Sequence, residues 1–212
     1  MEIFVKTILI LGGEPASGKS TLMRRFMNEM GEWNSSEPKK TLQVLYNKNS
    51  DCYVLGKYEE GVLFAGTDRL SMSVQPVAGE FVKETQSNIV LEGDRLFNKK
   101  FIDYIMTLSD TRLMIIHVKA DEDVMKNRHK DRGDDQTETF IKSRHTKVNN
   151  IVTSPELSEF VAVRMNNDIS QQISIVDLMK KLINVTEEEY ESIRKANKNA
   201  APVSGGTLSD FF

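Results

Sequence analysis

The sequence predicts an α/β protein of three layers, in which a mainly parallel central sheet carries helices on both of its faces. Strand-like apolar runs alternate with segments of helical spacing along most of the chain, which is the pattern of parallel βαβ units. Residues 113–118 form an apolar run broken by one histidine, as in a central strand buried on both faces. A glycine-rich turn joins the first strand to the first helix.

Composition indicates one domain in a reducing compartment. The 212 residues suffice for a single α/β domain with a full core and a tail. Because the net charge is −3, any contact with nucleic acid must come from a local basic patch. The single cysteine, Cys52, excludes an internal disulfide and a cysteine cluster for zinc, which fits the cytoplasm. We expect no membrane contact, since the first apolar run stops at Leu11 and carries no basic leader.

The N-terminal part begins with a strand and a helix. The apolar run at 7–11 predicts the strand, and apolar residues then recur at helical spacing from Leu22 until Gly31 offers a C-cap. The polar residues 32–40 indicate a loop. Further apolar runs, each bounded by turn residues, predict strands at 42–46, 52–58, 62–65, 88–92, 113–118 and 160–165.

Helical spacing accounts for most of the remaining chain. Pro76 suits the first turn of a helix, and Phe97, Phe101 and Ile105 form one apolar stripe. These and similar patterns predict helices at 76–86, 96–108, 121–130, 137–148 and 173–183. We expect a globular domain over 1–185, a charged helix over 186–198 that leads away from it, and a flexible linker with a terminal peptide over 199–212.

The turn after the first strand has the spacing of a phosphate-binding loop. Residues 13–20 fit the pattern G-x-x-x-x-G-K-[ST]. The two glycines permit backbone angles that turn successive N–H groups inward, toward phosphate oxygens at a helix N-terminus. The lysine would reach the β- and γ-phosphates of ATP. We assign nucleotide contacts to Gly13, Glu14, Ala16, Ser17, Gly18, Lys19, Ser20 and Thr21. The alternative is a glycine-rich turn with an incidental lysine.

A second strand end offers oxygen ligands for a metal. The apolar run at 88–92 ends in Glu92, which is where phosphate-loop enzymes hold Mg²⁺ or its water from the strand beside the loop. We predict a magnesium site formed by Ser20 and Glu92, with Asp94 as the second choice for the carboxylate. The alternative is that Glu92 caps the following helix.

Phosphoryl transfer often also uses a carboxylate that takes the proton of the acceptor. Asp68 follows a predicted strand, and we predict that it acts as the general base. Its neighbour Arg69 can pair with that carboxylate or hold a phosphate of the substrate, so we count Arg69 among the catalytic residues. The alternative is that Asp68 caps a helix beginning near Leu70.

Two arginines are candidates for a lid. Arg128 and Arg132 stand four residues apart and would share one face of a helix. We predict that they close over ATP and stabilise the transferred charge, with Arg144 as a candidate third member. The alternative is a solvated run of charges with no catalytic role.

The last six residues form a candidate partner-binding peptide. Leu208, two spacers and then Phe211 and Phe212 would lie on one side of a short helical turn, ready for an apolar pocket. A flexible linker before them would raise their local concentration at whatever the domain binds. The alternative is a tail that folds onto its own domain.

With these residues in view, the chain resembles the P-loop nucleoside and polynucleotide kinases, and more closely the 5-hydroxymethyluracil DNA kinases of tailed bacteriophages. The resemblance covers roughly residues 5–185. It is carried by the loop at 13–21, by the segment 64–76 with its Thr-Asp-Arg-Leu-Ser string, and by residues 89–97. The terminal peptide is similar to those by which replication proteins bind sliding clamps, although Gly205 stands where such peptides commonly have glutamine.

The resemblance implies ATP-dependent phosphorylation of the hydroxymethyl group of 5-hydroxymethyluracil in DNA, a step toward hypermodified thymidines. Asp68 lies where related kinases keep the carboxylate that activates the acceptor. Glu92 stands where many P-loop kinases have an aspartate. A sliding clamp would explain how an acidic enzyme stays on DNA.

Two other functions stay open on the sequence. A kinase for a free nucleoside or nucleotide would use the same chemistry on a small acceptor. A nucleotide-binding adaptor tethered to a sliding clamp would bind the nucleotide and phosphorylate nothing. Guanine-specific switches carry Asn-Lys-x-Asp, and the nearest string, at 47–50, lacks the aspartate.

Overall fold

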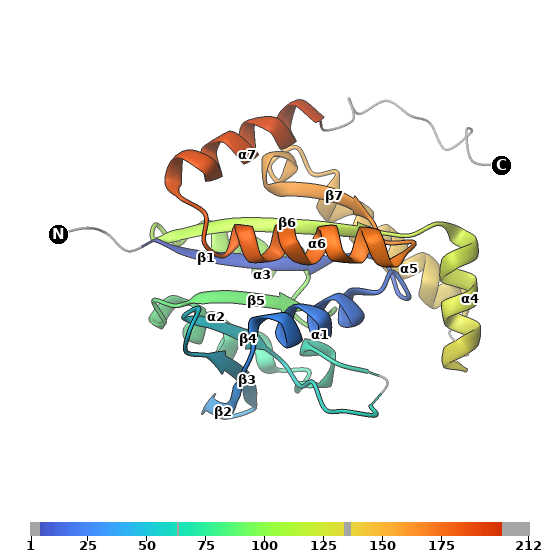
Figure 1. The fold of residues 1–212 in the computed structure, drawn as a ribbon, viewed down its shortest axis with the longest axis horizontal. Coiled ribbons are helices and arrows are strands. Elements are labelled where there is room, and N and C mark those ends of the chain that lie inside the picture. The colour runs from blue at the N-terminus through green and yellow to red at the C-terminus, as the bar shows by residue number, and fades with distance from the viewer. Residues whose placement is uncertain (1–4, 63, 134–136, 201–212) are drawn as a thin grey trace.

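A central sheet runs through the molecule (Figure 1). The computed structural model describes residues 5–62, 64–133 and 137–200, without the side chains of Arg132 and Ala200. The strands are β1 (Lys6–Gly12), β2 (Asn34–Lys39), β3 (Leu42–Asn47), β4 (Cys52–Leu55), β5 (Asn88–Glu92), β6 (Thr111–Lys119) and β7 (Val161–Met165). Their order is β2-β3-β4-β5-β1-β6-β7, and the pairs from β4 to β7 are parallel. The prediction of a mainly parallel sheet is confirmed.

One edge of the sheet differs from the sequence prediction. The polar residues predicted as a loop at 32–40 contain β2, which pairs antiparallel with β3. Nearly all side chains of β2 are exposed, so no apolar alternation marked this segment as a strand. The strand predicted at 62–65 is wrong for the described residues there, which form none. That segment lies within the loop that an antiparallel bridge between Lys57 and Gly66 closes.

Helices cover both faces of the sheet, which confirms the three layers (Figure 1). The helices are α1 (Lys19–Met30), α2 (Val74–Glu84), α3 (Lys99–Met106), α4 (Glu122–Arg132), α5 (Glu138–Val152), α6 (Ile169–Leu182) and α7 (Glu187–Ala200), with short 3₁₀ turns η1 (Thr67–Arg69) and η2 (Ser158–Phe160). Ile8 and Ile10 of β1 pack with α2, α3 and α5, whereas Leu9 and Leu11 pack with α1 and α6. No helix of the described part is long and apolar enough to cross a membrane.

The C-terminal helix packs against the domain, so our expectation that it leads away is wrong. Tyr190 of α7 is 5% exposed, and its hydroxyl donates to the carbonyl of Leu113 at 3.1 Å. Arg194 pairs with Glu159 of η2 at 2.6 Å. Tyr190 belongs to the core and Ile193 packs against it, but two apolar residues among the charges of α7 were too few to indicate this docking in the sequence. The helix includes residues 199 and 200 of the expected linker, and the rest of the tail lies outside the described residues.

The turn after β4 packs closely against the backbone of the segment that leads to η1. Gly56 has φ +114°, and a Cβ there would lie 2.2 Å from the backbone carbon of Gly66. Gly31 has φ +94° with nothing within 4 Å. We expect Gly56→Ala to lower the free energy of unfolding by about 1–3 kcal/mol more than Gly31→Ala, because only the former overpacks. Urea denaturation measures both, and equal losses would contradict the packing described here.

Candidate active site

The phosphate loop connects β1 to α1 through residues in the left-handed region. Gly13, Ala16 and Gly18 have φ of +148°, +60° and +93°. A Cβ on Gly13 would lie 2.3 Å from the carbonyl oxygen of Val118 in β6. A Cβ on Gly18 would lie 2.3 Å from Nδ2 of Asn166. Both glycines are therefore required by backbone conformation and by close neighbours on the outer side of the loop.

Lys19 lies across the loop it terminates. Its Nζ donates to the carbonyl oxygens of Gly13 and Glu14 at 2.9 and 2.7 Å. The Glu14 carboxylate in turn lies 2.8 Å from Nδ1 of His145 on α5. The ammonium group is thus held at the loop, where it can meet the oxygens of a bound phosphate. Thr21, the last of the predicted nucleotide contacts, lies in α1 and is exposed.

Ser20 and Glu92 meet at the start of α1. The Ser20 hydroxyl donates to Oε1 of Glu92 at 2.9 Å, and the Tyr58 hydroxyl donates to the same oxygen at 3.4 Å. Glu92 is 2% exposed, and this burial raises the pKa of its carboxyl to about 7. The alternative of a cap on the next helix is not seen, since Asn98 caps α3.

This pair of oxygens fits Mg²⁺. Magnesium usually takes one or two protein oxygens and completes its octahedron with water and phosphate oxygens, which suits a hydroxyl beside a carboxylate. No group of three or more His, Cys, Asp or Glu able to hold a metal occurs among the described residues. Asp94, the second choice for the carboxylate, instead pairs with Arg144 at 2.8 Å and Lys147 at 3.4 Å.

Asp68 stands on η1 and lines the cleft, where its side chain is open to the water inside the cavity. Its Oδ1 accepts a hydrogen bond from the backbone N–H of Arg95 at 3.1 Å. The pKa of its carboxyl is raised, first because the surrounding walls withdraw it from bulk water and then because Asp94 is close. The alternative role as a cap near Leu70 is wrong, since α2 begins only at Val74.

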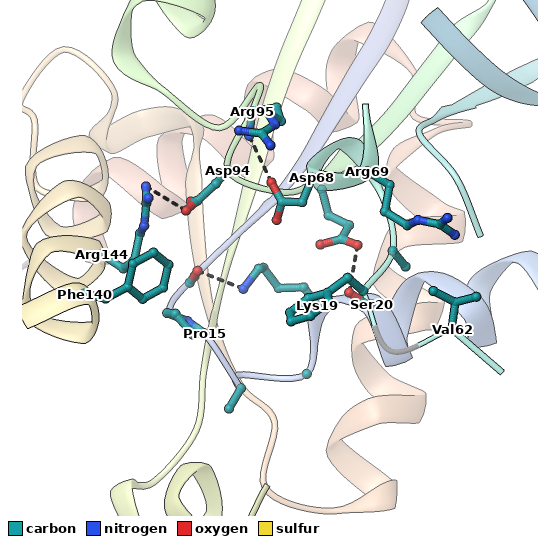
Figure 2. A pocket seen from close by; sticks show the side chains of 16 residues that line it. Pro15, Lys19, Ser20, Val62, Asp68, Arg69, Asp94, Arg95, Phe140 and Arg144 are labelled. Carbon is teal, nitrogen blue, oxygen red and sulfur yellow. Dashed lines mark hydrogen bonds and ion pairs between the residues drawn. The ribbon is translucent and has the colours of Figure 1, made fainter. Parts of the chain in front are cut away.

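These elements border one cleft of about 540 Å³. Figure 2 shows the side chains of Lys19, Ser20 and Asp68 around it, with Phe140 and Arg144 of α5 on one side and Arg69 and Val62 on the other. The phosphate loop and the predicted base therefore face the same space. A phosphate held by the loop would lie close to the carboxylate that can take a proton from an acceptor.

Comparison with known proteins identifies the family. A family model described as P-loop Nucleotide Kinase3 matches residues 5–177. The chain belongs to this family. A solved structure, a fungal RNA kinase, is similar with a TM-score of 0.51 and 12% identity over 97% of this chain and 100% of that chain. At this identity the similarity concerns the fold. No curated protein matches the chain. The protein is thus a P-loop kinase, a phosphotransferase whose acceptor these comparisons do not specify.

The predicted arginines of this kinase occupy different places. Arg69 lines the cleft but pairs with Glu59 at 2.8 Å and not with Asp68. Arg128 lies behind the phosphate loop, where Nη1 donates to the carbonyls of Ala16 and Ser17 at 3.2 Å each. Their catalytic roles stay predictions. The side chain of Arg132 lies outside the described residues, whereas Arg144 lines the cleft.

Tyr58, Arg95 and Asn166 are among the residues of this kinase site that the sequence interpretation missed. Tyr58 contacts Glu92, and nothing in its strand-like surroundings indicated a polar role. Arg95 lines the cleft beside Asp68. Asn166 is fully buried and donates from Nδ2 to the carbonyl of Ser17 at 2.7 Å. Its position directly after β7, at the carboxyl edge of the sheet, is a signal that could have found it.

The buried carboxyl of Glu92 gives the metal-free kinase a testable pH dependence. Because its pKa is raised to about 7, the folded state keeps a proton that the unfolded state loses near pH 4.5. Stability from this group is therefore present at low pH and falls as pH rises from 4.5 to 7, by about 3 kcal/mol in all. We expect Glu92→Gln, measured by urea denaturation with EDTA, to lack this decline. A decline of equal size in both proteins would contradict the assignment.

Proposed function

We propose that this kinase transfers the γ-phosphoryl group of ATP to the hydroxymethyl group of 5-hydroxymethyluracil in DNA, in the cytoplasm of the cell that contains it. The single observation behind the proposal is that Lys19 and Asp68 line one cleft. The segment around Asp68 is also one of the three by which the sequence resembles the phage DNA kinases. An acceptor hydroxyl beside Asp68 would face the phosphate held by the loop.

In this mechanism, the loop amides and Lys19 hold the β- and γ-phosphates. Asp68 takes the proton of the hydroxymethyl group as its oxygen forms a bond to the γ-phosphorus, while the bond between that phosphorus and the β,γ-bridging oxygen breaks and ADP leaves. The raised pKa of Asp68 makes it a better proton acceptor than an ordinary aspartate. Ser20 and Glu92 would hold Mg²⁺, which when bound neutralises phosphate charge.

A free nucleoside or nucleotide is the second candidate acceptor. The family's own description, a nucleotide kinase, favours it. The roles of Lys19, Ser20 and Asp68 would be the same. The two candidates therefore differ in whether the base enters the cleft from DNA or from solution.

We also propose that the C-terminal peptide binds a sliding clamp through Leu208, Phe211 and Phe212, residues that lie outside the described part of the chain. Deleting 207–212 should leave phosphorylation of short oligonucleotides unchanged, because the cleft is formed by other elements. Clamp binding, measured by surface plasmon resonance, should be lost. If the deletion also ends phosphorylation, the peptide belongs to the fold of the enzyme.

The acceptor is tested by transfer from γ-labelled ATP to three substrates: a duplex containing 5-hydroxymethyluracil, the free nucleoside and its monophosphate. We expect label in the duplex with wild type. We expect none with Lys19→Ala, because this variant lacks the ammonium group that would contact the β- and γ-phosphates. Label in the free compounds alone would contradict the DNA proposal and favour the second candidate. ATP binding without transfer to any of the three would favour the adaptor function.

A further inference from the structure

Two exposed aromatic side chains lie in the cleft. Phe64 is 54% exposed and Phe140 is 37% exposed, and both line the cavity that contains Asp68. Phe26 and Phe97, by contrast, are 0% and 2% exposed. The two come from separate elements, since Phe64 lies between β4 and η1 and Phe140 lies in the first turn of α5. Exposed aromatic rings within a substrate cleft suit a flat ligand.

The ring of Phe140 is held in place. The guanidinium carbon of Arg144 lies 4.6 Å from its centroid (Figure 2). Arg144 is itself fixed by the ion pair with Asp94 at 2.8 Å, and Asp94 receives a second cation, Lys147. A ring that is ordered before binding loses little entropy when a ligand stacks on it. Asp94 therefore holds Arg144, and through Arg144 the ring of Phe140, in position.

A cationic side chain lies beside Asp68 in the cleft. Arg95 is among the residues that line the cleft, its backbone N–H donates to Asp68, and its Nη1 donates to Sδ of Met72. A guanidinium carries five N–H donors, so its other donors can meet an acceptor on a ligand. The ring carbonyls of a pyrimidine are such acceptors.

Resting on the proposed function, we propose that the acceptor nucleobase packs against Phe64 and Phe140 and accepts a hydrogen bond from Arg95. The 5-substituent of a pyrimidine projects into the major groove of a duplex. To enter the cleft beside Asp68, the base would leave its stack, as bases do in enzymes that carry out chemistry on them. The aromatic rings would replace the stacking that is lost. A free nucleoside presents the same base, so the recognition chemistry is shared by both sources.

The test compares Phe64→Leu and Phe140→Leu with wild type by steady-state kinetics. Each should raise the KM for the acceptor about 10- to 100-fold, the effect of losing one stacked base contact, with the KM for ATP unchanged. Phe140→Tyr keeps an aromatic ring and should restore the acceptor KM. Ile173→Ala, an apolar residue of α6 that is 41% exposed outside the cleft, is the control and should change neither constant.

A second measurement identifies the source of the base. With 2-aminopurine opposite 5-hydroxymethyluracil and a non-hydrolysable ATP analogue present, extrusion of the base from DNA raises the fluorescence. We expect this rise with wild type and its loss in the double Leu variant. An acceptor KM effect seen only with the nucleoside, without the rise, supports the same subsite filled from solution.

Unchanged acceptor KM values in either Leu variant, or a raised KM for ATP in their place, would overturn the subsite. That result leaves the proposed function intact, because wild type would still phosphorylate DNA. Failure of the proposed function is separate, since wild type itself would then label no acceptor.

Discussion

The buried carboxylate of Glu92 joins the segments on which the site depends. One of its oxygens accepts from Ser20 at the start of α1 and from Tyr58 in the segment after β4. Its backbone carbonyl accepts from Thr67 of η1 at 2.9 Å. A Cβ on Gly66 would lie 2.5 Å from its Oε1. The turn that carries Asp68 is therefore packed directly against the strand end that faces the phosphate loop.

The outer side of the phosphate loop is fixed by a second set of contacts. Arg128 donates to the carbonyls of Ala16, Ser17 and Asn166, and Asn166 donates to Ser17. Carbonyls held on the outside leave the loop amides free to turn inward, toward phosphate. Arg128 lies on α4, so this helix is tied to the loop from behind while α5 carries Phe140 and Arg144 into the cleft.

The sequence predicted the parts of the site whose chemistry is local. The loop from Gly13 to Ser20 is recognisable because its function depends on backbone conformation within a few residues. Glu92 was found because parallel strands end at one edge of the sheet, so an acidic residue after an apolar run falls near the loop. The three-layer fold was predictable because β5, β1 and β6 are each an apolar run, as expected of neighbouring strands that are covered on both faces.

Features that depend on distant partners could not be predicted in this way. The place of Arg128 is set by carbonyls more than a hundred residues away in the chain. β2 has no apolar face, so only its pairing with β3 reveals it. α7 docks through the buried Tyr190 and through the ion pair of Arg194 with Glu159, and neither contact can be recognised without its distant partner.

The central claim is that the phosphate loop and Asp68 act on the same transferred group. Single-turnover kinetics of Asp68→Asn, together with its dissociation constant for ATP, tests this most directly. The account predicts a rate about 10²–10⁴-fold lower, the usual contribution of a general base, with ATP binding unchanged. A wild-type rate in this variant would contradict it.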